Sequence, residues 1–248
     1  MDTINKPAGN TKSEELDSIA FGNLFKMIRV EGGTFMMGAS GKCSEDSRED
    51  EVPVHEVTLN NYYIGEFPVT RALWHRVMGG NKPQDGSIPI GKVNWFDCHK
   101  FIRKLNKLTD SCYYFFLPTE AQWEFAARGG IKSQGYKYAG SDDLDEVAWY
   151  AGNSGKTKHP VGQKKPNELG IFDMTGNISE WCEDEWDIYP EESQVNPKIE
   201  PEGANKIFRG GNCSSVPARC RVSNRSNSET MMRSMVIGFR LAMKLVNR

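Results

Sequence analysis

The stretch GIFDMTGNISEWC at residues 170–182 constrains the fold of this chain more than any other segment. Asp173 and Glu180 supply two carboxylates, and Gly176 between them permits a backbone turn that few other residues tolerate. The carbonyl oxygens of Gly176 and Ile178 can then face the same point as the two side chains. Calcium takes roughly six to eight oxygen ligands and mixes carboxylates with backbone carbonyls and water. The spacing leaves two interpretations open: a calcium-binding loop, or a turn whose acidic side chains are solvated.

Length and composition limit the class of protein. A chain of 248 residues is long for one ordinary domain and short for two. Its 38% hydrophobic and 26% charged residues suit a soluble globular protein, and a formal net charge of -2 provides no basic field for nucleic acid. No apolar run has membrane-spanning length, and the N-terminus lacks a hydrophobic signal core. We therefore expect a cytoplasmic, single-domain protein that binds neither nucleic acid nor membranes.

The chain order predicts one domain with a short polar lead-in. Residues 1–22 are assigned to this lead-in, and residues 23–248 to the domain. Strand-like patterns occur at 25–30 and at 54–59, where apolar and polar residues alternate. After residue 130 the chain is rich in Gly, Asn, Lys and Pro, which predicts long loops that something else must hold in place. The six cysteines contain no C-x-x-C pair and are expected to be reduced.

Three helices have clear start signals. Thr70 and Asn94 can each cap a helix whose apolar residues recur at helical spacing, and Thr119 begins a capping box. Glu120 and Glu124 on the third helix look catalytic in isolation. We favour a structural role for both, as helix caps and as partners of arginines in buried ion pairs.

Separated motifs resemble a known family, the formylglycine-generating enzyme (sulfatase-modifying factor) family. These motifs are GIFDMTGNISEW at 170–181, LPTEAQWEFAAR at 117–128, RGG at 209–211 and IGFRLA at 237–242. The resemblance extends over about residues 27–245 and implies an α+β, loop-rich variant of the C-type lectin fold with short helices and small antiparallel sheets. It also implies calcium ligands at Asp173, Gly176, Ile178 and Glu180, the first and last through side chains and the other two through carbonyls.

The same resemblance makes the absence of a cysteine pair informative. Family members that generate formylglycine use a C-x4-C pair after the RGG motif, and soft thiolates of this kind select Cu(I). The corresponding positions here are Pro217 and Val222, so no copper is expected. Cys213 and Cys220 lie nearby, but their spacing does not preserve the family geometry. The residues therefore weaken an oxidase assignment, although a sulfatase-modifying formylglycine-generating oxidoreductase remains the alternative.

The C-terminal third resembles the variable proteins of diversity-generating retroelements, which diversify residues on this same fold. Small polar residues, methionines and a valine stand there between arginines and glycines, without a clean helical or strand period. Methionine adapts easily to different contact partners. The implied ligand-contacting residues are Asn212, Cys213, Ser214, Ser226, Asn227, Ser228, Met231, Met232, Ser234, Met235 and Val236. The implied frame residues are Arg209, Arg221, Arg225 and Arg240.

These observations predict a non-catalytic ligand-binding protein with a contact surface in residues 212–236. Its partner would be a protein or a glycan. An open alternative is that the same segments are ordinary loops of an enzyme that has lost its catalytic residues.

Overall fold

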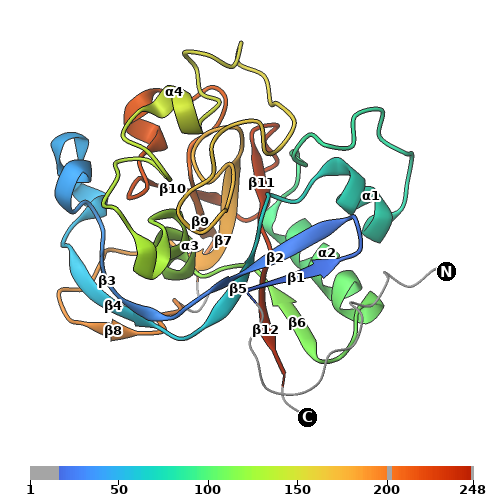
Figure 1. The fold of residues 1–248 in the computed structure, drawn as a ribbon, viewed down its shortest axis with the longest axis horizontal. Coiled ribbons are helices and arrows are strands. Elements are labelled where there is room, and N and C mark those ends of the chain that lie inside the picture. The colour runs from blue at the N-terminus through green and yellow to red at the C-terminus, as the bar shows by residue number, and fades with distance from the viewer. Residues whose placement is uncertain (1–16, 200–202, 247–248) are drawn as a thin grey trace.

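The computed structural model describes residues 17–199 and 203–246 and builds them into three small sheets joined by long loops (Figure 1). The largest sheet has five antiparallel strands in the order β1-β2-β5-β12-β6. Their bounds are Ser18–Phe21, Phe25–Val30, Tyr62–Gly65, Ala242–Leu245 and Tyr113–Phe116. Strands from both ends of the described chain therefore belong to the same sheet.

Strand β1 lies inside the predicted lead-in and changes the predicted domain boundary. It pairs with β2, and its Ile19 and Phe21 are buried in the core. The packed domain therefore begins by residue 18 and not at residue 23. Two apolar residues at alternate positions of a short edge strand were too weak a signal in a polar segment. The rest of the predicted lead-in, residues 1–16, lies outside the described residues.

Two further sheets complete the framework. One has the order β10-β9-β7-β11, and the other has the order β3-β4-β8. The strands of the first are Arg225–Glu229, Asn205–Arg209, Ser179–Glu185 and Ile237–Phe239. Those of the second are Gly33–Met37, His55–Leu59 and Gln194–Val195. Pairing is antiparallel except between β11 and β7 and between β4 and β8.

Four α-helices and four 3-10 helices occur in the described ranges, and the first three α-helices begin where the sequence predicts. The α-helices are α1 Arg71–Met78, α2 Trp95–Leu108, α3 Glu120–Ala127 and α4 Leu144–Val147. The 3-10 helices are η1 Gly41–Asp46, η2 Glu49–Glu51, η3 Gly130–Lys132 and η4 Pro217–Cys220. Thr70, Asn94 and Thr119 are the N-caps of α1, α2 and α3, and the last two close full capping boxes. The three predicted helix starts are confirmed.

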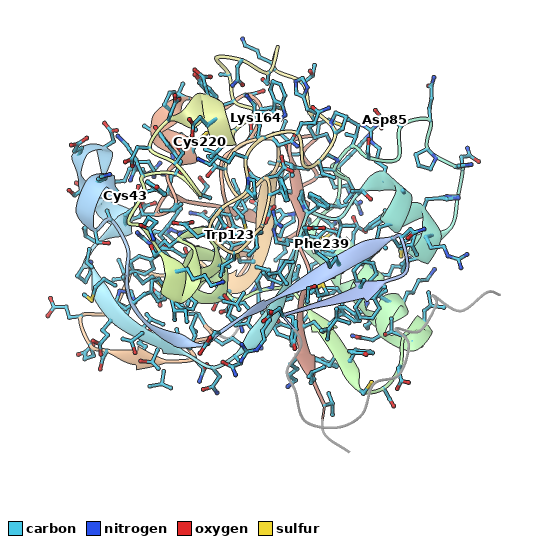
Figure 2. All side chains as sticks on the ribbon, viewed as in Figure 1. Cys43, Asp85, Trp123, Lys164, Cys220 and Phe239 are labelled. Atoms are coloured by element: carbon cyan, nitrogen blue, oxygen red, sulfur yellow. The ribbon has the colours of Figure 1, made fainter. Side chains whose placement is uncertain are left out.

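The core lies between these elements. One apolar cluster packs α1 and α2 against the five-stranded sheet, and a second surrounds α3. Figure 2 labels one fully buried aromatic residue from each cluster, Phe239 and Trp123. No helix within the described ranges is long and apolar enough to cross a membrane.

Buried arginines join the C-terminal strands to helix α3. Arg209 lies 2.9 Å from Glu120 and also pairs with Glu124, and all three side chains are almost completely buried. Arg225 makes a bidentate contact with Glu120, at 2.7 Å and 2.8 Å. The prediction that Glu120 and Glu124 serve buried arginine pairs is confirmed. Burial alone would raise the pKa of Glu120, but Arg225 and Arg209 outweigh it, and the pKa lies below its usual value.

We predict that Glu120→Gln lowers the free energy of unfolding by about 3 kcal/mol or more, because it leaves buried arginine charge without its partner. Urea unfolding near neutral pH measures the loss. A carboxylate whose folded-state pKa is lowered stabilises the protein above its unfolded-state pKa and loses that contribution as the pH falls through the folded-state value. The difference between wild type and variant should therefore shrink in acid.

The matched control for this prediction is Glu146→Gln. Glu146 pairs with Lys165 at 3.4 Å, and both side chains are about half exposed. Its unfolding curve should stay close to that of the wild type. Equal losses in the two variants would contradict the assignment of the buried network as a main source of stability.

Candidate binding face and calcium loop

The acidic loop is built on unusual backbone conformations. Asp173 and Asn177 have φ of 56° and 57°, and Gly176 has φ of 74°. A Cβ atom at Gly176 would lie 2.4 Å from the carbonyl oxygen of Trp149, so both conformation and space require glycine there. The predicted turn is therefore present, and it is packed inside the protein.

Asp173 is a buried carboxylate without an ion-pair partner among the residues that the structure describes. Gly162 N donates to its Oδ2 at 2.8 Å, and Asn177 Nδ2 donates to its Oδ1 at 3.1 Å. Burial raises the pKa of Asp173, and these two hydrogen bonds offset only part of the effect. A bound cation would relieve this cost.

Glu180 has a different environment. Arg240 Nε donates to its Oε2 at 3.0 Å, Arg240 Nη2 donates to its Oε1 at 2.9 Å, and Trp123 Nε1 donates to Oε2 at 2.7 Å. A carboxylate accepts about four hydrogen bonds, so roughly one acceptor position remains. Glu180 therefore shares its charge with Arg240, and the carbonyl of Gly176 already accepts from Ile178 N at 2.7 Å. Of the four calcium ligands that the resemblance implies, Asp173 is the one whose environment would favour a cation. No cluster of three or more His, Cys, Asp or Glu side chains suited to a metal occurs in the described ranges.

The positions of the family's cysteine pair carry no thiol. Pro217 is the exposed first residue of η4, and Val222 is fully buried. All six cysteines are free thiols. Cys213 and Cys220 are buried; burial raises the pKa of Cys213 and brings that of Cys220 to about 12. Neither thiol is poised to form the thiolate that acts as a nucleophile or copper ligand.

The predicted contact residues divide into exposed, half-buried and buried groups. Met231, Met232 and Met235 are 64%, 49% and 58% exposed. Ser214 and Asn227 are also exposed. The half-buried members are Asn212, Ser226, Ser228, Ser234 and Val236. Cys213 is 1% exposed, so its side chain cannot belong to a contact surface in this conformation.

Residues 225–229 form strand β10, although their sequence shows no strand period. β10 is an edge strand that pairs only with β9. Its backbone hydrogen bonds to β9, rather than an alternating sequence pattern, hold it as a strand. Successive side chains of a strand point to opposite faces. Ser226 and Ser228 therefore share one face of the sheet, and Asn227 points to the other. The predicted set does not form a single continuous surface.

Two segments of the set meet at Ser179. Asn212 Nδ2 donates to Ser179 Oγ at 3.1 Å, and Ser179 N donates to the carbonyl of Val236 at 3.0 Å. Asn212 and Val236 therefore both lie against Ser179. Val216, which the sequence reasoning did not select, is 57% exposed beside Ser214.

The start of α2 supports the segment 230–236. Trp95 N donates to the carbonyl of Thr230 at 3.1 Å, and Lys92 N donates to that of Ser234 at 2.7 Å. Arg233 pairs with Asp97 on α2.

The first turn of α2 adds Phe96, a residue that the sequence reasoning missed. Its side chain is 50% exposed and stands beside Trp95. The signal was present, because Trp95, Cys98 and Ile102 define the buried face of this helix and leave Phe96 outside it. We use the name variable face for the exposed residues of these segments, Phe96, Ser214, Val216, Met231, Met232 and Met235.

Comparison with known proteins identifies sequence relatives of this chain. The sequence matches the family described as Sulfatase-modifying factor enzyme 1-like domain over residues 12–245. It is 34% identical over 236 residues to chaperone protein LppX of Paenibacillus barcinonensis, covering 75% of this chain and 77% of the relative. It is 32% identical over 288 residues to the formylglycine-generating enzyme of Streptomyces coelicolor, covering 87% and 88%.

A solved structure has a similar fold. Treponema denticola variable protein 1 superposes with a TM-score of 0.78 at 28% identity, over 88% of this chain and 94% of that protein. This likeness confirms the predicted α+β, C-type lectin-like fold. The chain spans only 38% to 40% of the length of the Chlamydia serine/threonine-protein kinases that it also matches. Because the family match runs through nearly all of the described residues, this chain belongs to the sulfatase-modifying factor enzyme 1-like family.

Proposed function

We propose that this chain is a non-catalytic ligand-binding protein that contacts a protein or glycan through the variable face. The observation that carries the proposal is the contrast between this face and its support. The methionines and Phe96 are exposed, whereas the arginines of the same C-terminal region are fully buried and ion-paired. The similarity to a variable protein supports the same function and supports diversification of this surface by a retroelement.

The frame explains how such a surface could change without loss of the fold. Exposed side chains contribute little to stability, whereas buried side chains contribute through packing and ion pairs. Arg225 at the start of β10 is buried, and the exposed methionines follow it after a few residues. Within one segment, some positions thus stabilise the fold while nearby positions face solvent.

We predict that Met231→Ala, Met232→Ala and Met235→Ala each change the free energy of unfolding by no more than about 0.5 kcal/mol, because surface substitutions usually have small effects. The control is Met243→Ala on β12, where the side chain is 0% exposed. It should cost about 2–5 kcal/mol. Denaturant unfolding measures all four variants, and a core-sized loss at the exposed methionines would argue against a free contact surface.

The alternative function is formylglycine generation, supported by the relation to the Streptomyces coelicolor enzyme. We predict that the protein, supplied with Cu(I), forms no formylglycine on a peptide containing Cys-x-Pro-x-Arg. The reason is the placement of Pro217 and Val222 where thiolates are needed, together with the raised pKa of Cys220. Mass spectrometry of the peptide gives the readout, with a formylglycine-generating enzyme as positive control. Copper-dependent formation of the aldehyde would establish the alternative.

We also propose that the acidic loop binds calcium through Asp173 and the carbonyls of Gly176 and Ile178. The supporting observation is the buried Asp173 carboxylate: burial raises its pKa more than its two hydrogen bonds and the nearby Arg240 lower it, and no ion pair to it occurs among the described residues. Glu180 is a poor test of this site, because its loss would also leave Arg240 without its bidentate partner.

We predict that calcium raises the melting temperature of the chelator-treated protein, because a ligand bound only by the folded state stabilises it, by about 2.7 kcal/mol at 100 times Kd. Asp173→Asn should abolish this rise, while Glu180→Gln should lower the melting temperature with or without calcium. The calcium effect should weaken as the pH falls through the raised pKa of Asp173, because protons compete for the carboxylate. An unchanged melting temperature of the wild type on adding calcium would remove calcium from the proposal.

A further inference from the structure

A pocket separate from the variable face lies between helix α2 and strand β6, which run side by side in Figure 1. Its cavity volume is about 290 Å³. This lies near the lower limit of the range of about 300–1,000 Å³ that is usual for small-molecule sites. A ligand of this pocket would therefore be smaller than a drug-sized molecule.

The wall of the pocket is rigid. Asn106 on α2 clamps Phe115 on β6, since its Nδ2 donates to the Phe115 carbonyl at 2.9 Å and its Oδ1 accepts from Phe115 N at 2.8 Å. The capping box of Thr119 and Gln122 holds the corner between β6 and α3. These bonds engage the side chains of Asn106, Thr119 and Gln122 with the backbone and hold the pocket walls in place before any ligand binds.

The floor and one wall are apolar. Ile102, Phe115 and Leu117 form the buried floor, with exposed fractions of 5%, 0% and 0%. Tyr114 and Phe116 stack with ring centroids 6.2 Å apart along the wall. Aromatic walls of this kind favour a flat, apolar ligand body.

The charges of the pocket are unbalanced toward positive. Glu183 is its one carboxylate, and it lies 3.1 Å from His99 and 3.7 Å from Lys198. Arg103 and Lys244 also line the pocket. Both side chains are exposed, no described carboxylate pairs with either of them, and the Lys244 ammonium lies 5.4 Å from the centroid of the Tyr114 ring. A planar guanidinium and an ammonium group beside an apolar floor match an anion with an apolar body.

We propose that this pocket binds a small organic acid, with its ring on the apolar floor and its carboxylate at Arg103 and Lys244. The proposal does not depend on the function of the variable face. It makes the chain a receptor for a small carboxylate at a second place on the fold. A bidentate arginine contact provides the specificity for a carboxylate over a neutral group of the same shape.

The test uses three probes with the same ring and chain: 3-phenylpropionate, 3-phenylpropan-1-ol and 3-phenylpropylamine. Isothermal titration calorimetry of the full chain should show saturable binding of the carboxylate, with a Kd on the order of 1 mM or tighter for a ligand of this size. The alcohol should bind at least about tenfold more weakly, corresponding to about 1.4 kcal/mol, and the amine should not bind.

Paired variants separate the site from general charge effects. Arg103→Gln with Lys244→Gln should weaken 3-phenylpropionate binding at least tenfold, or about 1.4 kcal/mol. The control, Lys104→Gln with Lys107→Gln, removes two exposed charges from the same helix outside the pocket and should leave the affinity unchanged. Unaltered melting temperatures would show that both variants fold. Equal binding of acid and alcohol, equal affinity in the two variants, or no saturable binding would overturn the proposal.

Discussion

The fold depends on buried arginines that pair with carboxylates far away in the sequence. Arg221 reaches Glu51 across 170 residues, and Arg225 reaches Glu120 across 105. Arg221 also donates to the carbonyl of Cys43, a backbone oxygen inside a short 3-10 segment. A loop-rich chain leaves many carbonyls without a partner in regular secondary structure, and each buried one must be satisfied. One guanidinium with five donors can satisfy several at once while its charge is neutralised by a carboxylate. The arginines thus provide hydrogen bonds to backbone carbonyls of the loops, as neighbouring strands do within the sheets.

This arrangement separates the residues that hold the fold from those that face solvent. Buried and exposed residues of this kind lie only a few positions apart in the sequence. In β10 the guanidinium of Arg225 is buried against Glu120, while Asn227 two residues later is exposed. In η4 the side chain of Arg219 is exposed, and that of Arg221, just after the helix, is buried. A surface carried by such segments can change its chemistry while the interior keeps its ion pairs. The same separation would allow irregular segments to form the contact surface proposed above.

Local signals predicted the fold well, and long-range partners were harder to predict. The helix starts at Thr70 and Thr119 depend on bonds within a few residues, so the sequence contains the whole signal. The roles of the buried arginines followed from their residue type and motif context. The contact of Glu180 with Arg240 did not, because two residues 60 positions apart meet only in the folded chain. Strand β10 was missed for a related reason: its polar side chains show no alternation, and its pairing with β9 supplies the order.

The protonation of the buried Cys220 thiol limits the chemistry that this part of the fold supports. A thiol must ionise before it can attack or bind copper. Burial raises the pKa of Cys220 to about 12, so the thiolate is strongly disfavoured near neutral pH. Its neighbours Tyr138 and Leu144 supply an apolar setting, and no described cation pairs with its sulfur. The side chain of Cys220 therefore contributes to packing within an apolar cluster. Activation of the thiol would need the opposite, a partly exposed and electropositive site.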